Sequence, residues 1–102
     1  MYILVLVTAK DKRQARKIAK ILIRNRLAAC VNILGKVESF FLWQGKVDSA
    51  SEALLIIKSK KIKMPKIIRL VKSLHSYDLP EIISLPITSG FKPYLNWINE
   101  SC

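Results

Sequence analysis

LAACVNILGKVESFFLWQGKVDSASEALLIIKSK, residues Leu27–Lys60, is the stretch that decides the fold of this chain. Two long segments rich in apolar residues lie on either side of Gln44-Gly45. This dipeptide is a weaker form of the Asn-Gly signal for a tight turn between two strands. The stretch therefore predicts a long β-hairpin with its turn at Gln44-Gly45.

The arms of this hairpin are unusually long. The first arm should form a strand over 27–34 and continue extended over 37–43, with a bulge or bend at Gly35. The second arm should run over 46–60, and its most apolar part is ALLII, residues 53–57. Arms of about 15 residues are well beyond the usual five or six. They must overhang a domain this small, and an overhanging apolar ribbon needs a partner, so we predict oligomerisation from this feature alone.

The residues before the hairpin predict a strand and a helix. Tyr2–Val7 is a continuous apolar run, which is typical of a central strand covered on both faces. A helical period then extends to about Arg26, with Asp11 as its N-cap or first-turn acid. The side expected to be buried carries Ala15, Ile18, Ala19 and Leu22, and the outer side carries Arg13, Arg16, Lys17, Lys20 and Arg24.

The residues after the hairpin predict a second helix, a strand and a short closing helix. Pro65 suits a first helical turn, and the buried stripe that follows should be Ile67, Ile68, Val71 and Leu74. A strand is indicated by the alternation of Ile83, Leu85 and Ile87, in which Pro86 favours an edge position. The closing helix is indicated after Pro93 by Tyr94, Trp97 and Ile98. The fold class is therefore α+β: a ferredoxin-like β-α-β-β-α-β sandwich with a long β-hairpin and a short C-terminal helix.

Composition and charge exclude several classes of protein. The 102 residues suit a single domain over 1–102, and 51% hydrophobic with 25% charged residues excludes disorder. Lys and Arg number 18 against 7 Asp and Glu, so the net charge is +11. The apolar run at the start, 1–9, is far shorter than the ~20 residues that cross a bilayer, and no basic residue precedes it. We therefore expect a mature cytoplasmic protein with no membrane partner.

Four motifs follow one another along nearly the whole chain: RLAACVN (26–32), WQGK (43–46), HSYDLPEII (75–83) and YLNWI (94–98). In this order and at these separations they resemble the CutA family of divalent-cation tolerance proteins. The resemblance implies a ferredoxin-like protomer in a tight homotrimer whose long hairpin strands pair between subunits, an architecture similar to that of the nitrogen-regulatory signal-transduction trimers. It also implies a non-enzymatic protein that binds copper and other divalent ions.

In such a trimer, the aromatic residues of the hairpin are expected at the subunit contact. The interface that we predict contains Phe40, Phe41, Trp43 and Gly45. The alternative for the aromatic rings is stacking on a base or another ring of a ligand. Near the turn, Asp48 and Glu52 have two interpretations, either as ligands of a hard cation or as exposed solvating groups.

The metal ligands that we expect are His75, Glu81 and Cys30, and the metal is copper(II) or another divalent cation that is not required for folding. Soft and borderline ions prefer imidazole or thiolate. The copper ligands that the resemblance implies are a cysteine and two adjacent histidines, which match Val7 and Leu74-His75 here, so that only His75 is retained.

Each of these three residues has a structural alternative. His75 ends a helix, and its ring nitrogens could bond to nearby backbone or to Asp78. Glu81 could be a solvated residue at the start of a strand, and Cys30 a small buried side chain in an apolar strand. The other cysteine, Cys102, is expected to be a frayed terminal thiol.

The basic excess supports a second function class. A trimer would carry three times the +11 charge of the chain, which favours a basic signal-transduction or binding scaffold with weak, non-specific attraction to nucleic acid. The aromatic third strand of RNA-binding ferredoxin-like sheets is absent, because residues 53–58 read ALLIIK. Seven acids and one histidine assemble no catalytic set that we recognise, so an enzyme is the least favoured class.

Overall fold

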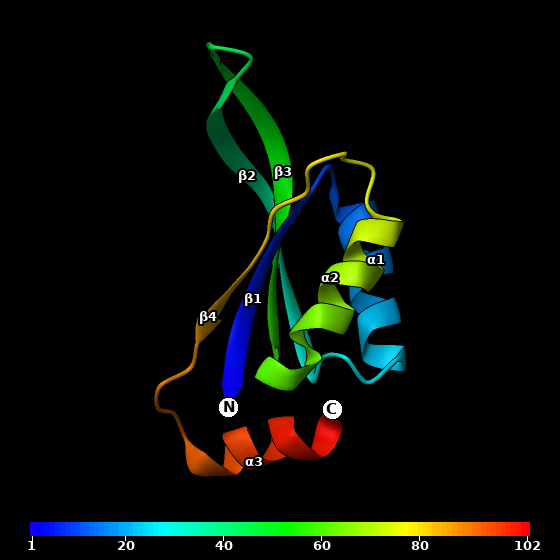
Figure 1. Ribbon diagram of the computed structural model, residues 1–102, viewed down its shortest axis with the longest axis vertical. Coiled ribbons are helices and arrows are strands. Elements are labelled where there is room, and N and C mark those ends of the chain that lie inside the picture. Colours follow the sequence, from blue (N-terminus) through cyan, green and yellow to red (C-terminus); the bar gives the residue numbers. More distant parts are fainter.

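A computed structural model describes residues 1–102 (Figure 1). The elements in chain order are β1 (Tyr2–Ala9), α1 (Lys12–Arg24), β2 (Cys30–Trp43), β3 (Lys46–Lys60), a 3-10 turn η1 (Lys61–Lys63), α2 (Met64–Leu74), β4 (Ile82–Pro86) and α3 (Lys92–Ser101). The four strands form one sheet in the order β2-β3-β1-β4, and every neighbouring pair is antiparallel. Helices α1 and α2 lie on one face of the sheet, and α3 lies across its end near the N-terminus (Figure 1). The predicted ferredoxin-like α+β fold is confirmed. None of the helices is both long and apolar enough to cross a bilayer.

Helix α1 begins where the sequence predicts. The Asp11 carboxylate accepts a hydrogen bond of 2.8 Å from the Gln14 N–H, which satisfies one of the free donors of the first turn. The four residues of the expected inner stripe, Ala15, Ile18, Ala19 and Leu22, are all buried. The basic residues of the outer side are exposed. The spacing of apolar residues was therefore sufficient to orient this helix.

Strand β2 begins at Cys30, and not at Leu27 as predicted. The difference arises because the residues before Cys30 terminate α1. The Leu27 N–H donates to Leu22 O over 2.9 Å, and the Leu27 carbonyl accepts from the buried Ser59 hydroxyl over 2.6 Å. These bonds turn the chain from the helix into the sheet, and regular pairing with β3 starts only after them.

A bulge interrupts the pairing of β2 with β3 at the predicted glycine. Leu34 pairs with Leu54, whereas Val37 pairs with Glu52, so Gly35 and Lys36 together stand opposite a single residue of β3. Lys36 adopts a left-handed conformation with a φ of 58°. Because one extra residue shifts the alternation, odd-numbered β2 residues beyond the bulge share a face with even-numbered β3 residues. Phe41 and Trp43 therefore lie on one face of the hairpin and Phe40 on the other.

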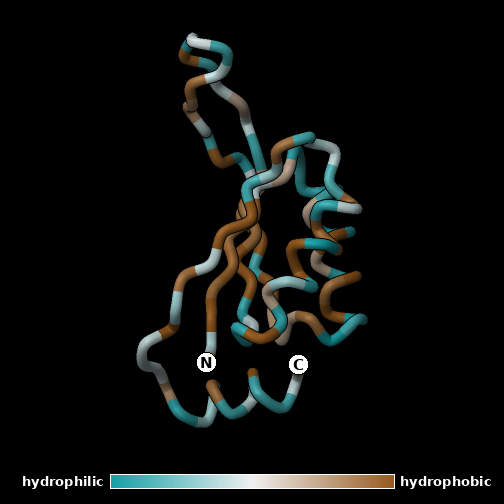
Figure 2. The backbone as a smooth tube through the Cα atoms, in the orientation of Figure 1, coloured by the Kyte–Doolittle hydropathy of each residue, from teal (hydrophilic) through white to brown (hydrophobic).

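The hairpin ends in the predicted turn and extends beyond the rest of the domain (Figure 1). Gln44 and Gly45 have φ values of 50° and 79°, the pair of positive angles that a type I′ turn requires. The molecule measures 45 × 25 × 23 Å, and its long dimension runs through the hairpin. Figure 2 shows that this overhanging part carries hydrophobic segments among its hydrophilic ones, far from the core.

The two faces of the sheet are covered differently. Ile3, Val5 and Val7 of β1 are fully buried beneath α1 and α2, in a cluster of 15 buried apolar residues. The opposite face, which we call the open face, is formed by Leu4, Leu6, Leu34, Leu54, Ile56, Ile83 and Leu85. On it, Ile83 and Leu85 are 51% and 46% exposed, and the others are half-buried or exposed. The prediction that β1 is covered on both faces is wrong for the single chain, because α1 and α2 both lie on the other face and α3 reaches the open-face side only at the end of the sheet, at Cys30 and Lys60.

The C-terminal half departs from the predictions in detail. In α2, Ile67 and Val71 are buried, but Ile68 is exposed and Leu74 half-buried, because this 11-residue helix faces the core along one narrow stripe. Strand β4 is an edge strand, as Pro86 indicated. Cys102 is not frayed: its thiol donates to Ile98 O over 3.3 Å at the end of α3 and lies 3.9 Å from the Ser59 hydroxyl.

Candidate functional site

His75 stands at the C-cap of α2 with both ring nitrogens bonded to backbone. Its Nε2 is 2.6 Å from Thr8 O, at the end of β1, and its Nδ1 accepts from the Tyr77 N–H over 3.1 Å. A carbonyl oxygen can only accept, so Nε2 carries the hydrogen and Nδ1 provides the lone pair. These contacts agree with the alternative in which the ring nitrogens of His75 bond to nearby backbone and do not bind a metal. A metal ion could reach a ring nitrogen only by displacing one of them.

Tyr77 connects His75 to a buried carboxylate. The two rings pack with their centroids 4.7 Å apart and tilted by 51°. The Tyr77 hydroxyl donates to Glu52 Oε2 over 2.9 Å. Burial, followed by this hydrogen bond and the charge of Glu52, raises the pKa of Tyr77 to about 12. Glu52 is only 8% exposed, so the interpretation of Glu52 as an exposed solvating group is wrong: the segment after α2 folds over it.

Glu81 follows on the same segment, just before β4. The residue as a whole is exposed, yet its carboxyl group is partly desolvated against the protein. This burial, and after it the negative charge of Glu52, raises the pKa of the Glu81 carboxyl above its usual range. The two carboxyl groups therefore influence each other, although they are far apart in the sequence.

Glu52 and Glu81 belong to a hollow of about 660 Å³ between the overhanging part of the hairpin and the segment after α2, which we call the acidic hollow. It is lined by the four acidic residues Asp48, Glu52, Asp78 and Glu81 and by the aromatic residues Phe40, Phe41, Trp43 and Tyr77, of which Phe40 has its side chain on the opposite face of the hairpin from Phe41 and Trp43. No Lys, Arg or His lines it. Four of the seven acids of a chain with a net charge of +11 thus gather around one cavity.

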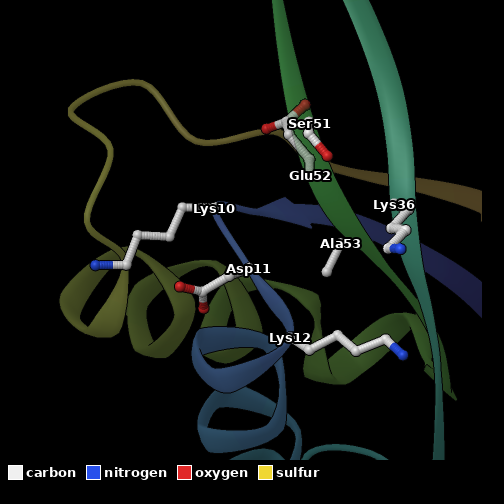
Figure 3. A pocket seen from close by; sticks show the side chains of 7 residues that line it. All are labelled: Lys10, Asp11, Lys12, Lys36, Ser51, Glu52 and Ala53. Atoms are coloured by element: carbon white, nitrogen blue, oxygen red, sulfur yellow. The ribbon is translucent and has the colours of Figure 1, made fainter.

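A smaller hollow of about 260 Å³ lies on the other side of Glu52, where Lys10, Lys12 and Lys36 surround it with Asp11. Figure 3 shows Lys12 and Lys36 extending to one side of this hollow and Lys10 to the opposite side. The lysine ends diverge, and two carboxylates share the space with them. The arrangement balances charges locally and does not concentrate positive charge on one point.

Cys30 lies far from the other two expected metal ligands. It pairs with Lys58, whose ammonium donates to the thiol over 3.7 Å, at the end of the sheet that is opposite to His75. Lys58 is aligned with Leu4 of β1, whereas His75 contacts Thr8; four strand residues span about 13 Å. The chain places no three His, Cys, Asp or Glu side chains together as a metal-binding group.

The residues expected at the subunit contact all lie in the overhanging part of the hairpin. Phe40, Phe41 and Trp43 are 68%, 40% and 50% exposed, and Gly45 forms the turn. Neither the open face nor the Tyr77–Glu52 contact was predicted from the sequence. The alternation of Ile83 and Leu85 was a sequence signal for the open face. No sequence pattern indicates a contact between two residues as far apart in the chain as Tyr77 and Glu52.

Comparison with known proteins identifies the family. Residues 3–101 match the model of the family described as CutA1 divalent ion tolerance protein. The chain is 45% identical over 97 residues to the divalent-cation tolerance protein CutA of Thermus thermophilus, covering 95% of this chain and 94% of that protein. It is 43% identical to the chloroplastic protein CutA of Arabidopsis thaliana, of which it spans only about half, 54%.

Solved structures agree with this assignment. The divalent cation tolerance protein of Thermus thermophilus superimposes with a TM-score of 0.97 at 44% identity, covering 99% of this chain and 98% of that one. CutA1 from Oryza sativa superimposes with a TM-score of 0.95 at 42% identity, covering 98% and 92%. Fold, motifs and sequence identity along the whole chain lead to one conclusion: the chain belongs to the CutA1 family of divalent ion tolerance proteins.

Proposed function

We propose that this chain is the protomer of a homotrimer that binds divalent cations, copper(II) among them, and that it catalyses no reaction. The observation that carries the proposal is the acidic hollow. Negative side chains concentrated in a concave site focus the local potential, even where the net charge of the protein is strongly positive. A cation is therefore attracted to this one place and repelled by the rest of the surface. The name of the family, divalent ion tolerance, agrees with such a role.

The proposed trimer rests on two apolar surfaces that the single chain leaves uncovered. One is the open face of the sheet, and the other is the exposed aromatic part of the hairpin. Contiguous apolar surface of this extent is uncommon on monomeric proteins and favours association. The three-fold state itself comes from the resemblance to the family. Packing of one subunit's hairpin on the next would bury both surfaces together.

Copper(II) is the divalent ion for which the chain offers a nitrogen donor, the imidazole of His75. Neutral imidazole suits copper, which stands at the top of the divalent affinity order. The lone pair of His75 at Nδ1 accepts from the Tyr77 N–H, so copper would have to displace that donor. Glu81 lies on the same segment and supplies negative charge. The expected affinity is modest, and folding does not depend on the metal.

Two measurements test the proposal on the full chain. Sedimentation velocity at micromolar concentration should give a species of three times the 11.6 kDa chain mass. Calorimetric titration with copper chloride should show saturable binding that weakens in Glu81→Gln and remains in Glu100→Gln, a matched loss of one charge on α3. A stable monomer would refute the assembly, and equal affinity in the two variants would refute the site.

A second candidate function, a basic binding scaffold, is favoured by the outer side of α1. Its basic residues Arg13, Arg16, Lys17, Lys20 and Arg24 are all exposed. Such a stripe attracts phosphate backbones without reading bases, so affinity for nucleic acid should fall steeply with salt. Tight, sequence-selective RNA binding at high salt would favour this function over the first.

A further inference from the structure

The wall of the acidic hollow is aromatic as well as acidic. Phe41, Trp43 and Tyr77 line the same cavity as the four acidic residues, and no basic residue lines it. Aromatic faces attract ammonium groups through the ring quadrupole, most strongly where water is excluded. Carboxylates beside aromatic rings are therefore the combination that recognises an amine, because the charge is neutralised and the carbon chain is covered.

Glu52 supplies a buried charge that forms no direct ion pair, although the lysines of the smaller hollow lie on its other side. It is more than nine-tenths buried, and its Oε2 accepts from the Tyr77 hydroxyl. Its other oxygen, Oε1, accepts no hydrogen bond from the chain, yet it is not sealed from solvent. Burial of a carboxylate is costly unless a cation or several donors compensate it. A cationic group in the hollow would supply that compensation.

The separated carboxylates of the hollow suit an organic cation, in addition to the metal ion that His75 is proposed to hold. Metal ions take four or more ligands at about 2.0–2.6 Å, and no three acidic, histidine or cysteine side chains converge here. The carboxylates are instead distributed around a cavity of about 660 Å³, which is the size range of small-molecule sites. Carboxylates that are separated around a cavity match a cation whose positive groups are also separated.

We infer that the acidic hollow binds an organic ammonium ion with two or more amine groups, a linear diamine or polyamine. The inference rests on the proposed cation binding and names the class of ligand at that site. The amines pair with Glu52 and Glu81, and the methylene chain packs on the hairpin rings. Because Phe41 and Trp43 are also assigned to the subunit contact, the site lies at the boundary of the proposed trimer.

The test is calorimetric titration of the full chain at low salt with 1,4-diaminobutane and with spermidine. The matched neutral probe is 1,4-butanediol, which has the same carbon chain without charge. A protein with a net charge of +11 repels dications in general, so saturable binding of the amines reports a local site. We expect both amines to bind, spermidine more tightly, and the diol to give no heat of binding.

Variants locate the site. Glu81→Gln removes one charge from an exposed residue and should weaken amine binding about tenfold, as expected for the loss of a charge-assisted contact. Glu52→Gln should do the same while its amide oxygen still accepts from Tyr77. The matched control is Glu100→Gln, which should bind as the wild type does. Circular dichroism of each variant checks that the fold is intact.

The outcomes separate this inference from the proposed function. Equal amine affinity in wild type, Glu81→Gln and Glu100→Gln would overturn the inference. Copper binding without amine binding would also overturn the inference, but it would leave the proposed metal binding standing. Amine binding by a chain that sediments as a monomer would support the inference and refute the proposed trimer.

Discussion

The imidazole of His75 bonds to Thr8 O through Nε2 and to the Tyr77 N–H through Nδ1. If copper binds here, it takes the Nδ1 lone pair and gives up the second of these bonds. We predict that His75→Ala lowers copper affinity several-fold in calorimetric titration. Both proteins should carry Cys102→Ser, which removes the terminal thiol as a competing ligand. Equal copper affinity in the two would mean that His75 serves only to join α2 to β1.

The hydrogen bond from the Tyr77 hydroxyl to Glu52 can be removed by a substitution that deletes a single oxygen atom. Tyr77→Phe leaves the buried carboxylate of Glu52 without its donor, at an expected cost of about 1–3 kcal/mol in unfolding free energy. Denaturation in urea at fixed protein concentration measures this cost. Tyr2→Phe is the matched control, because no hydrogen bond of the Tyr2 hydroxyl contributes to the fold, and its unfolding free energy should stay close to that of the wild type.

The same pair predicts a dependence on alkaline pH. The pKa of Tyr77 is about 12 in the folded chain, above the ordinary tyrosine value near 10. A raised pKa stabilises the fold fully below pH ~10, and this contribution is lost as the pH rises to about 12. The difference in stability between wild type and Tyr77→Phe should therefore narrow over this range. A constant difference would show that the hydroxyl proton is not involved.

Among the structural elements, the hairpin depends on its turn. Gly45 has a φ of 79°, which costs a residue with a Cβ about 1–2 kcal/mol. Gly45→Ala should lower the unfolding free energy by roughly that amount in chemical denaturation. Gly90→Ala is the matched control: its added Cβ would meet Leu95 at an ordinary 3.4 Å, so it should be neutral or slightly stabilising. An equal loss in both variants would contradict the role of the turn.

The elements also show how far the sequence determines the structure. Helix α1, the bulge at Gly35 and strand β3 could be predicted because each depends on neighbouring residues: a cap, a glycine or an alternation of apolar side chains. The exposure of Ile68 and the burial of Glu52 could not, because they depend on which distant element covers each residue. The candidate site combines both kinds, since Glu81 was expected there as a ligand, whereas the burial of Glu52 and its contact with Tyr77 were not expected.

For the molecule as a whole, the uncovered apolar surfaces predict assembly. Phe41→Asp places a charge on the hairpin surface that is assigned to the subunit contact, and burial of an unpaired charge is strongly unfavourable. We expect sedimentation velocity to show a shift toward monomer while the helix content stays constant by circular dichroism. Ile62→Asp changes another exposed apolar residue, 80% exposed and outside the hairpin, and should leave the oligomeric state unchanged. Dissociation by both variants would indicate a different contact.

The two-for-one pairing at Gly35 and Lys36 decides which side chains the outer hairpin presents on each face. Loss of the bulge without loss of a residue would pair Lys36 with Glu52 and shift residues 37–43 by one position along β3. Because a shift of one residue reverses the faces of a strand, Phe41 and Trp43 would then exchange sides with Phe40 and Leu42. Deletion of Gly35 or Lys36 would instead keep Phe41 opposite Asp48 on its present face. The surface offered to a neighbouring subunit therefore tolerates a shorter β2 at this point, but it does not tolerate a straightened one.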